Sequence, residues 1–178
     1  MKIKGITDED FVNYKLPSMF IITPTCTFKC DKENECQLCQ NSHLTREKEI
    51  EISKEELIKR YLSNPITKAI VFGGLEPFDS PMDLLSFIDC VRREFQCNDP
   101  IVIYTGYTED EILSGNFDGA NPNILETFVN NMLENKNIVI KYGRFRPNCE
   151  PHYDAVLGVK LVSDNQYAKE YNFENNTQ

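Results

Sequence analysis

Long apolar runs are absent from this 178-residue chain, and none approaches the about 20 residues that a helix needs to cross a bilayer. The first ten residues, MKIKGITDED, turn acidic where a signal peptide would be apolar. Basic residues are also scarce, with 19 Lys and Arg against 28 Asp and Glu, and the net charge of −9 repels a phosphate backbone. We therefore expect a cytoplasmic protein whose partners are neither membranes nor nucleic acids.

Several catalytic patterns are absent as well: no Ser-His-Asp order, phosphate-binding loop or paired-carboxylate pattern stands out, and no repeat is present. The hydrophobic content of 40% indicates a folded globule, and the length suits one domain. We expect that domain to cover residues 1–178, with a lead-in segment over 1–17 and a flexible tail over 172–178.

Apolar runs of strand length alternate with helical patterns four times along the chain. The predicted strands cover residues 19–22, 69–72, 101–104 and 138–140, with a further candidate at 156–162. Helices are predicted to begin at Ser53, Ser80 and Thr108, and another to lie around residues 124–134. This alternation is typical of βαβ units, so the predicted fold class is α/β with a parallel sheet. Sites in such folds lie at the carboxyl ends of the strands.

Four of the seven cysteines lie in one loop, residues 24–45, directly after the first predicted strand: Cys26, Cys30, Cys36 and Cys39. Thiolates that converge in this way hold a soft metal or an iron–sulfur cluster. Spacing alone leaves three alternatives: a cluster, a zinc site of two cysteine pairs with His43 as a spare ligand, or free thiols. An odd cysteine count without a secretion signal favours a reducing compartment over a disulfide framework.

Four short motifs follow one another along the chain. They are Cys26-x3-Cys30 with Cys39-Gln40-Asn41, then Gly73-Gly74-Leu75-Glu76-Pro77-Phe78, Tyr104-Thr105-Gly106-Tyr107 and Ser163-Asp164-Asn165-Gln166. In this combination the sequence resembles the radical S-adenosylmethionine (SAM) enzymes, and within them the anaerobic ribonucleotide-reductase activating enzymes. The resemblance covers roughly residues 18–167, and its specificity comes from the ordered combination of motifs.

The resemblance implies a partial, open parallel βα barrel that holds a [4Fe-4S] cluster and SAM. The implied cluster ligands are Cys26, Cys30 and Cys39, with Cys36 as an alternative second ligand. The residues implied to bind SAM are Asn41, Gly73, Gly74, Glu76, Pro77, Thr105 and Gly106. The implied reaction forms a 5′-deoxyadenosyl radical and installs a glycyl radical on a large anaerobic reductase. The implied electron donor is flavodoxin or a similar protein.

Two departures from the family pattern leave alternatives open. Eight residues, not two, separate Cys30 from Cys39, and Leu75 lengthens the glycine turn by one residue. Glu76 either pairs with the positively charged end of SAM or is a structural carboxylate. The chain could instead modify a peptide or small molecule, or be a zinc-stabilised binding module without catalysis. The basic stretch at residues 141–146 could receive an anionic ligand or an acidic partner, or be an ordinary solvated cluster.

Overall fold

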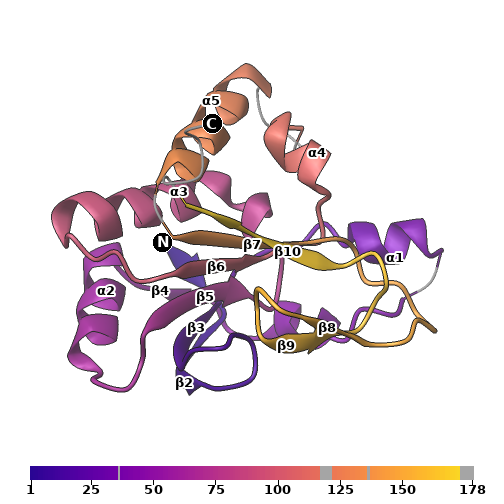
Figure 1. Ribbon diagram of the computed structural model, residues 1–178, viewed down its shortest axis with the longest axis horizontal. Coiled ribbons are helices and arrows are strands. Elements are labelled where there is room, and N and C mark those ends of the chain that lie inside the picture. Colours follow the sequence, from indigo (N-terminus) through magenta and orange to yellow (C-terminus); the bar gives the residue numbers. More distant parts are fainter. Residues whose placement is uncertain (36, 117–121, 136, 173–178) are drawn as a thin grey trace.

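A six-stranded mixed sheet forms the centre of the computed structural model (Figure 1), which describes residues 1–35, 37–116, 122–135 and 137–172. In the order β10-β7-β6-β5-β3-β2, the strands are Tyr167–Tyr171, Ile138–Tyr142, Ile101–Tyr104, Ala69–Gly73, Ser18–Ile22 and Gly5–Asp10. The four central strands β3, β5, β6 and β7 pair in parallel. The four apolar runs thus lie next to one another at the centre of a mixed sheet, and helices connect them.

The two outer strands, β2 and β10, were not among the strands predicted from the sequence. Residues 1–17, expected to be a lead-in segment, contain β2, which pairs antiparallel with β3. Strand β10 pairs antiparallel with β7. Both outer strands are largely polar, GITDED and YAKEY, because an edge strand contacts solvent and lacks the apolar run of a buried strand. Within the described ranges, β2 and β10 each have one pairing neighbour, so both edges of the sheet are open.

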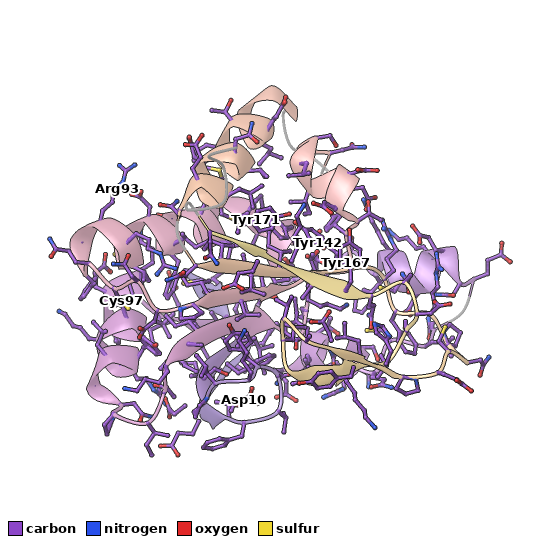
Figure 2. All side chains as sticks on the ribbon, in the orientation of Figure 1. Asp10, Arg93, Cys97, Tyr142, Tyr167 and Tyr171 are labelled. Atoms are coloured by element: carbon purple, nitrogen blue, oxygen red, sulfur yellow. The ribbon has the colours of Figure 1, made fainter. Side chains whose placement is uncertain are left out.

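Tyrosine side chains attach β10 to the rest of the molecule (Figure 2). The Tyr142 and Tyr171 hydroxyls lie 2.7 Å apart, and the rings of Tyr142 and Tyr167 have centroids 5.6 Å apart. The hydroxyls of Tyr167 and Tyr171 both donate to Glu109, at 2.9 and 3.1 Å. Of the tail predicted to be flexible, residues 173–178 lie outside the described residues.

The helices cover one face of the sheet (Figure 1). They are α2 (Lys54–Ser63), α3 (Pro81–Asp89) with a π-helical extension (Cys90–Glu94), α4 (Glu109–Leu113) and α5 (Pro122–Glu134). Ser53 accepts from the Glu56 amide, and Thr108 forms a complete capping box with Glu111, as their spacing predicts. Cys90 is buried in this core, whereas Leu62 of α2 is 48% exposed.

A hairpin of β8 (His152–Asp154) and β9 (Val159–Leu161) covers part of the other face. Its Leu157 and Leu161 pack with Tyr14 against the second set of strand side chains, which includes Val71 and Val102. The strand expected at 156–162 is thus shorter and belongs to this hairpin rather than to the main sheet. The hairpin covers part of this face and leaves the carboxyl ends of the parallel strands open to a cavity.

The remaining short elements are β1 (Lys2–Ile3) paired with β4 (Ile50–Glu51), α1 (Lys29–Glu33), and the 3-10 helices Ser42–Arg46 and Pro77–Asp79. No helix in the described part of the chain is long and apolar enough to span a bilayer. The cysteine loop follows β3, and the Thr-Gly-Tyr segment follows β6. The glycine turn begins at the last residue of β5, and the basic stretch begins within the last two residues of β7. The parallel pairing of these strands brings the four segments to the same edge of the sheet.

Candidate metal centre

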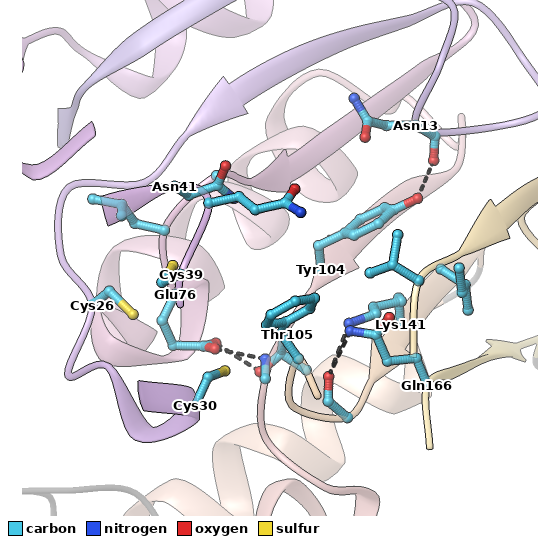
Figure 3. A pocket seen from close by; sticks show the side chains of 18 of the residues that line it. Asn13, Cys26, Cys30, Cys39, Asn41, Glu76, Tyr104, Thr105, Lys141 and Gln166 are labelled. Carbon is cyan, nitrogen blue, oxygen red and sulfur yellow. Dashed lines mark hydrogen bonds between the residues drawn. The ribbon is translucent and has the colours of Figure 1, made fainter. Parts of the chain in front are cut away.

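A cavity of about 480 Å³ lies at this edge and is lined by residues from all four strand ends (Figure 3). The predicted site residues that line it are Cys26, Cys30, Cys39, Asn41, Gly74, Glu76, Thr105 and Gly106. The other two predicted residues, Gly73 and Pro77, are buried beside it. The structure therefore gathers into one cavity residues that are up to 80 positions apart in the sequence.

The three described loop cysteines are half-buried and free of disulfides. Cys26 precedes α1 and its sulfur accepts from the Phe28 amide at 3.3 Å, while Cys30 lies within α1. Cys39 is held by Asp31, whose Oδ1 accepts from the Cys39 amide at 2.9 Å. Local hydrogen bonds thus determine where each sulfur lies. The alternative ligand Cys36 lies outside the described residues.

Burial controls the protonation of these sulfurs. It raises the pKa of the Cys26 thiol to about 12 and also raises the pKa values of Cys30 and Cys39. Backbone amides counteract this effect in part, from Phe28 at Cys26, from Phe145 at Cys30 and from Asn41 at Cys39. Metal binding therefore has to displace protons from thiols, and amide hydrogen bonds to the sulfurs then stabilise the thiolates and tune a bound cluster.

Among the described residues, the three loop sulfurs do not form a compact group of three donor atoms in this structure. Within the described ranges, three donor atoms lie within 4.8 Å of one another only in the group Glu55, Cys90 and Glu94, between α2 and the π-helical extension. The three loop sulfurs are spread more widely. A tetrahedral zinc site, with Zn–S bonds of about 2.3 Å, needs sulfurs about 3.8 Å apart. The wider spacing leaves room for a cluster of several irons.

Arg144 links the cysteine loop, through Glu33 of α1, to Glu111 of α4. Its guanidinium is buried, with Nε 2.8 Å from Glu33 Oε1 of α1 and with NH1 and NH2 donating to both oxygens of Glu111 at 2.8 and 2.7 Å. Burial raises the pKa of Glu111, but the hydrogen bonds from Arg144 and Thr108 outweigh it and lower that pKa to about 2. The bidentate pair holds Arg144 against α4, and the contact of its Nε with Glu33 attaches α1, and with it Cys30, to that pair.

Two further contacts hold the loop. The side-chain amide of Asn34 donates to the Cys30 carbonyl at 2.7 Å and to the Phe145 carbonyl at 3.0 Å. Asp79 accepts from the Thr27 amide and from the Tyr107 hydroxyl, the latter at 2.7 Å. The loop is therefore anchored to segments that follow β5, β6 and β7.

The glycine turn after β5 places the Glu76 carboxylate between the sulfurs and the Thr-Gly-Tyr segment. Gly74 has a φ of 76°, and a Cβ there would lie 2.9 Å from Ile22 Cγ2, so only glycine fits without strain. Leu75, the residue that lengthens the turn, is buried. The insertion is thus accommodated in the core, and Glu76 still lines the cavity.

Both oxygens of Glu76 already have partners inside the protein. Oε1 accepts from the Thr105 hydroxyl at 2.7 Å and the Phe78 amide at 3.1 Å, and Oε2 accepts from the Gly106 amide at 2.8 Å. Burial raises the pKa of Glu76 to about 7, although these hydrogen bonds act in the opposite direction. Glu76 therefore crosslinks the turns after β5 and β6. Its contact with SAM stays a prediction.

The basic stretch is not an ordinary solvated cluster, because Lys141 and Arg144 are both buried. The Lys141 ammonium faces the cavity and donates to the Gly143 carbonyl at 2.9 Å (Figure 3). Burial lowers its pKa to about 8. Sequence reasoning did not single out Lys141. The available signal was a charged residue that directly follows an apolar strand run, Ile138 to Ile140, in register with the other strand ends.

The Ser163–Gln166 segment braces the backbone of the basic stretch. Ser163 Oγ accepts from the Arg146 amide at 2.8 Å and donates to the Arg146 carbonyl at 2.9 Å. Asn165 Nδ2 donates to the Arg144 carbonyl at 3.0 Å, and Gln166 Nε2 donates to the Gly143 carbonyl at 3.3 Å. These bonds give a physical role to the fourth stretch noted in the sequence.

Comparison with known proteins gives one family. The sequence model of the 4Fe-4S single cluster domain matches residues 19–158, which include all three described loop cysteines and the turns after β5, β6 and β7. No match was found among curated proteins or among solved structures. The match supports the iron–sulfur interpretation of the loop over the zinc and free-thiol alternatives.

Proposed function

This chain belongs to the 4Fe-4S single cluster domain family, and from that premise we propose that it is a radical SAM enzyme. The observation that carries the proposal is that the three described loop sulfurs point into one cavity of about 480 Å³, which the turns after β5 and β6 also line (Figure 3). A metal site with an open coordination position is catalytic in character, whereas a closed one is structural. The cavity provides the space for a ligand of that open position.

The donor set fits a [4Fe-4S] cluster. Cys26, Cys30 and Cys39 would hold it, and their amide hydrogen bonds and partial burial suit thiolate ligation. When bound and reduced, such a cluster supplies the electron that cleaves SAM. We further propose that the sheet is an open barrel of radical SAM type, in which the cavity lies at the carboxyl ends of the parallel strands.

The protein's own residues position the ligand and exclude water. Glu76 holds the Thr105 hydroxyl and the Gly106 amide in place, so the turn after β6 keeps one conformation. Apolar side chains complete the wall: Phe20, Leu44, Leu75, Phe145, Val159 and Leu161. Asn41 contributes a polar edge next to Cys39. In this proposal Glu76, Thr105 and Gly106 act on SAM through the shape and hydrogen bonding of the cavity.

We propose that the radical is used to install a glycyl radical on a large reductase, with flavodoxin or a similar protein as the electron donor. The resemblance of the Thr-Gly-Tyr segment to the activating enzymes supports this role. The cavity rim also suits a protein partner, because Val12 and Val162 line the cavity while being 73% and 45% exposed. Phe11, next to Val12, is 62% exposed. Exposed apolar side chains beside a cavity are typical of an interaction surface.

The test is the formation of 5′-deoxyadenosine by anaerobically reconstituted protein supplied with SAM and dithionite. We expect product from the wild type and from Cys149→Ala, and none from Cys39→Ala. Cys149 is a matched control because it is half-buried and free, as Cys39 is, but lies outside the cavity lining. A cluster-loaded wild type that binds SAM but never cleaves it would contradict the proposal. The reductase role is tested separately, by the glycyl-radical electron paramagnetic resonance signal of a candidate partner.

A further inference from the structure

Asp79 and Tyr107 form a hydrogen-bonded pair next to the first cysteine of the loop. The Tyr107 hydroxyl donates to Asp79 Oδ1 at 2.7 Å, and Asp79 Oδ2 accepts from the amide of Thr27, the residue after Cys26. Neither Asp79 nor Tyr107 lines the cavity. The pair therefore contacts the cysteine loop from within the protein, and not from the side that a ligand in the cavity would occupy.

The segment that carries Asp79 holds Cys26 through both of its neighbours in the sequence. The Glu76 amide donates to the Thr25 carbonyl at 2.9 Å, and the Thr27 amide donates to Asp79. The residues before and after Cys26 are thus both attached to the segment that follows β5. This attachment keeps the Cys26 sulfur close to the Asp79 carboxylate.

Tyr107 is held so that its hydroxyl stays directed at Asp79. Its side chain is 1% exposed, its amide donates to Thr105 Oγ1 at 3.0 Å, and its carbonyl accepts from the Gly143 amide at 3.0 Å. The Lys29 ammonium lies 4.5 Å from the centroid of its ring. Burial and the hydrogen bond to Asp79 raise the pKa of Tyr107, so its hydroxyl keeps its proton and remains a donor at neutral pH.

Asp79 brings a negative charge close to Cys26. Its side chain is half-buried, and none of the ion pairs of the described residues includes it. The carboxylate interacts electrostatically with the Cys26 sulfur. One-electron reduction of a cluster adds negative charge, so a nearby carboxylate makes reduction less favourable. A hydrogen bond donated to that carboxylate weakens this effect, because it draws part of the charge away from the sulfur.

We propose that the pair sets the reduction potential of the cluster held at Cys26: the Asp79 carboxylate lowers the potential, and the Tyr107 hydroxyl limits that lowering. Both are positioning residues, because they act through Cys26 and its loop. The step concerned is the gain of one electron by the bound cluster from an external reductant, and the proton between the two side chains stays on Tyr107. The inference rests on the part of the proposed function that places a [4Fe-4S] cluster on Cys26, and not on cleavage of SAM.

The experiment is an anaerobic redox titration of cluster-loaded protein with dithionite at one fixed pH, followed by the electron paramagnetic resonance signal of the reduced cluster. We expect Asp79→Asn to shift the midpoint potential to a more positive value, because it removes the charge and keeps the shape. Tyr107→Phe should shift it to a more negative value, because the carboxylate loses a donor while the ring stays. In the Asp79→Asn background, Tyr107→Phe should no longer shift the potential.

The matched control is Asp89→Asn, which removes the same charge from an exposed position at the last residue of α3 and should leave the potential unchanged. Shifts of opposite sign separate the effect of charge from that of a loosened loop, because both substitutions weaken the same hydrogen bond. Potentials equal to that of the wild type, or shifts in one direction, would overturn the inference and leave the proposed function standing.

Iron and sulfide content guard against a folding defect. If Asp79→Asn does not retain iron, the sign of the shift in Tyr107→Phe decides alone, and an unchanged or more positive potential would overturn the inference. Loss of the cluster from both variants would also overturn it, because the pair would then be a structural clamp only. Full iron in Cys26→Ala would instead contradict the ligand assignment of the proposed function, and the inference would fail with it.

Discussion

The Gly106 amide donates to Glu76 Oε2 at 2.8 Å, and this bond joins the turn after β6 to the turn after β5. The same glycine lies against the metal centre, because a Cβ at position 106 would be 3.3 Å from Cys30 Sγ and 3.5 Å from Glu76 Oε2. One backbone position thus contacts a predicted cluster ligand and the buried carboxylate. Its lack of a side chain allows that approach.

Gly106→Ala should therefore affect the cluster more than the fold. The added methyl requires Cys30 Sγ to move by a few tenths of an ångström, and its backbone φ does not by itself forbid alanine. We expect faster loss of iron to a chelator, by about threefold to tenfold, with a decrease in unfolding free energy of less than about 1 kcal/mol. Iron release and chemical denaturation measure the two effects. If Gly106→Ala lost iron at the wild-type rate, the close approach of position 106 to Cys30 Sγ would not affect cluster retention.

The ligand assignment predicts a sharp division among the cysteines. Cys26→Ala, Cys30→Ala and Cys39→Ala should each lose cluster binding, because a cluster held by three thiolates loses a ligand in every case. Cys90→Ala should keep it, since Cys90 is buried in the helical core away from the cavity. Iron and acid-labile sulfide per chain give the measurement. If Cys30→Ala retained the full iron content, Cys36 and not Cys30 would be the second cluster ligand.

The site residues could be predicted because each lies next to an apolar strand. Cys26, Glu76 and Gly106 follow the runs that became β3, β5 and β6, and parallel strands necessarily end at the same edge. What the sequence could not show was which side chains are buried there. Lys141 belongs to a basic stretch for which the sequence left an anionic ligand, an acidic partner and a solvated cluster open, and the structure shows that its side chain is buried.

Glu76 should make stability depend on pH. Its pKa is about 7 in the folded state against 4.5 unperturbed, so the folded protein binds the proton more tightly than the unfolded chain. The stabilisation is complete below pH 4.5 and is lost as the pH rises to about 7. From pH 5 to pH 8, cluster-free wild type should lose about 2–3 kcal/mol relative to Glu76→Gln, at about 1.4 kcal/mol per pKa unit. Urea denaturation of both proteins at each pH gives this difference, and parallel pH curves would be inconsistent with it.

Arg144→Met should loosen the cysteine loop. The substitution removes the guanidinium shared by Glu33 of α1 and Glu111 of α4, and we expect a loss of about 2 kcal/mol of unfolding free energy, because the two carboxylates can rehydrate in part. The rate of iron release should rise at the same time. Arg146→Met is the control: that arginine is exposed and lies 3.9 Å from Asp164, so its loss should change stability by less than about 0.5 kcal/mol. If both variants changed the unfolding free energy and the rate of iron release equally, the structural role proposed for Arg144 would be wrong.

The outer strands show a second limit of prediction. The GITDED and YAKEY segments contain no apolar run, and their strand conformation depends on neighbours that are distant in the sequence. Strand β10 is held by Tyr142 and Glu109, 29 and 62 residues before Tyr171. A pattern read within a window of about 11–18 residues cannot contain such partners.

The contacts that hold the cysteine loop also set an order of events during synthesis. Asn34 is fixed by the Phe145 carbonyl, 111 residues further along the chain, and Glu33 by Arg144. At about 5–20 residues per second, the ribosome releases these anchors on the order of ten seconds after the cysteines. The nascent loop has its sulfurs before it has the contacts that position them. Iron delivery is therefore expected to follow completion of the sheet, when the chain has left the ribosome beyond Gln166.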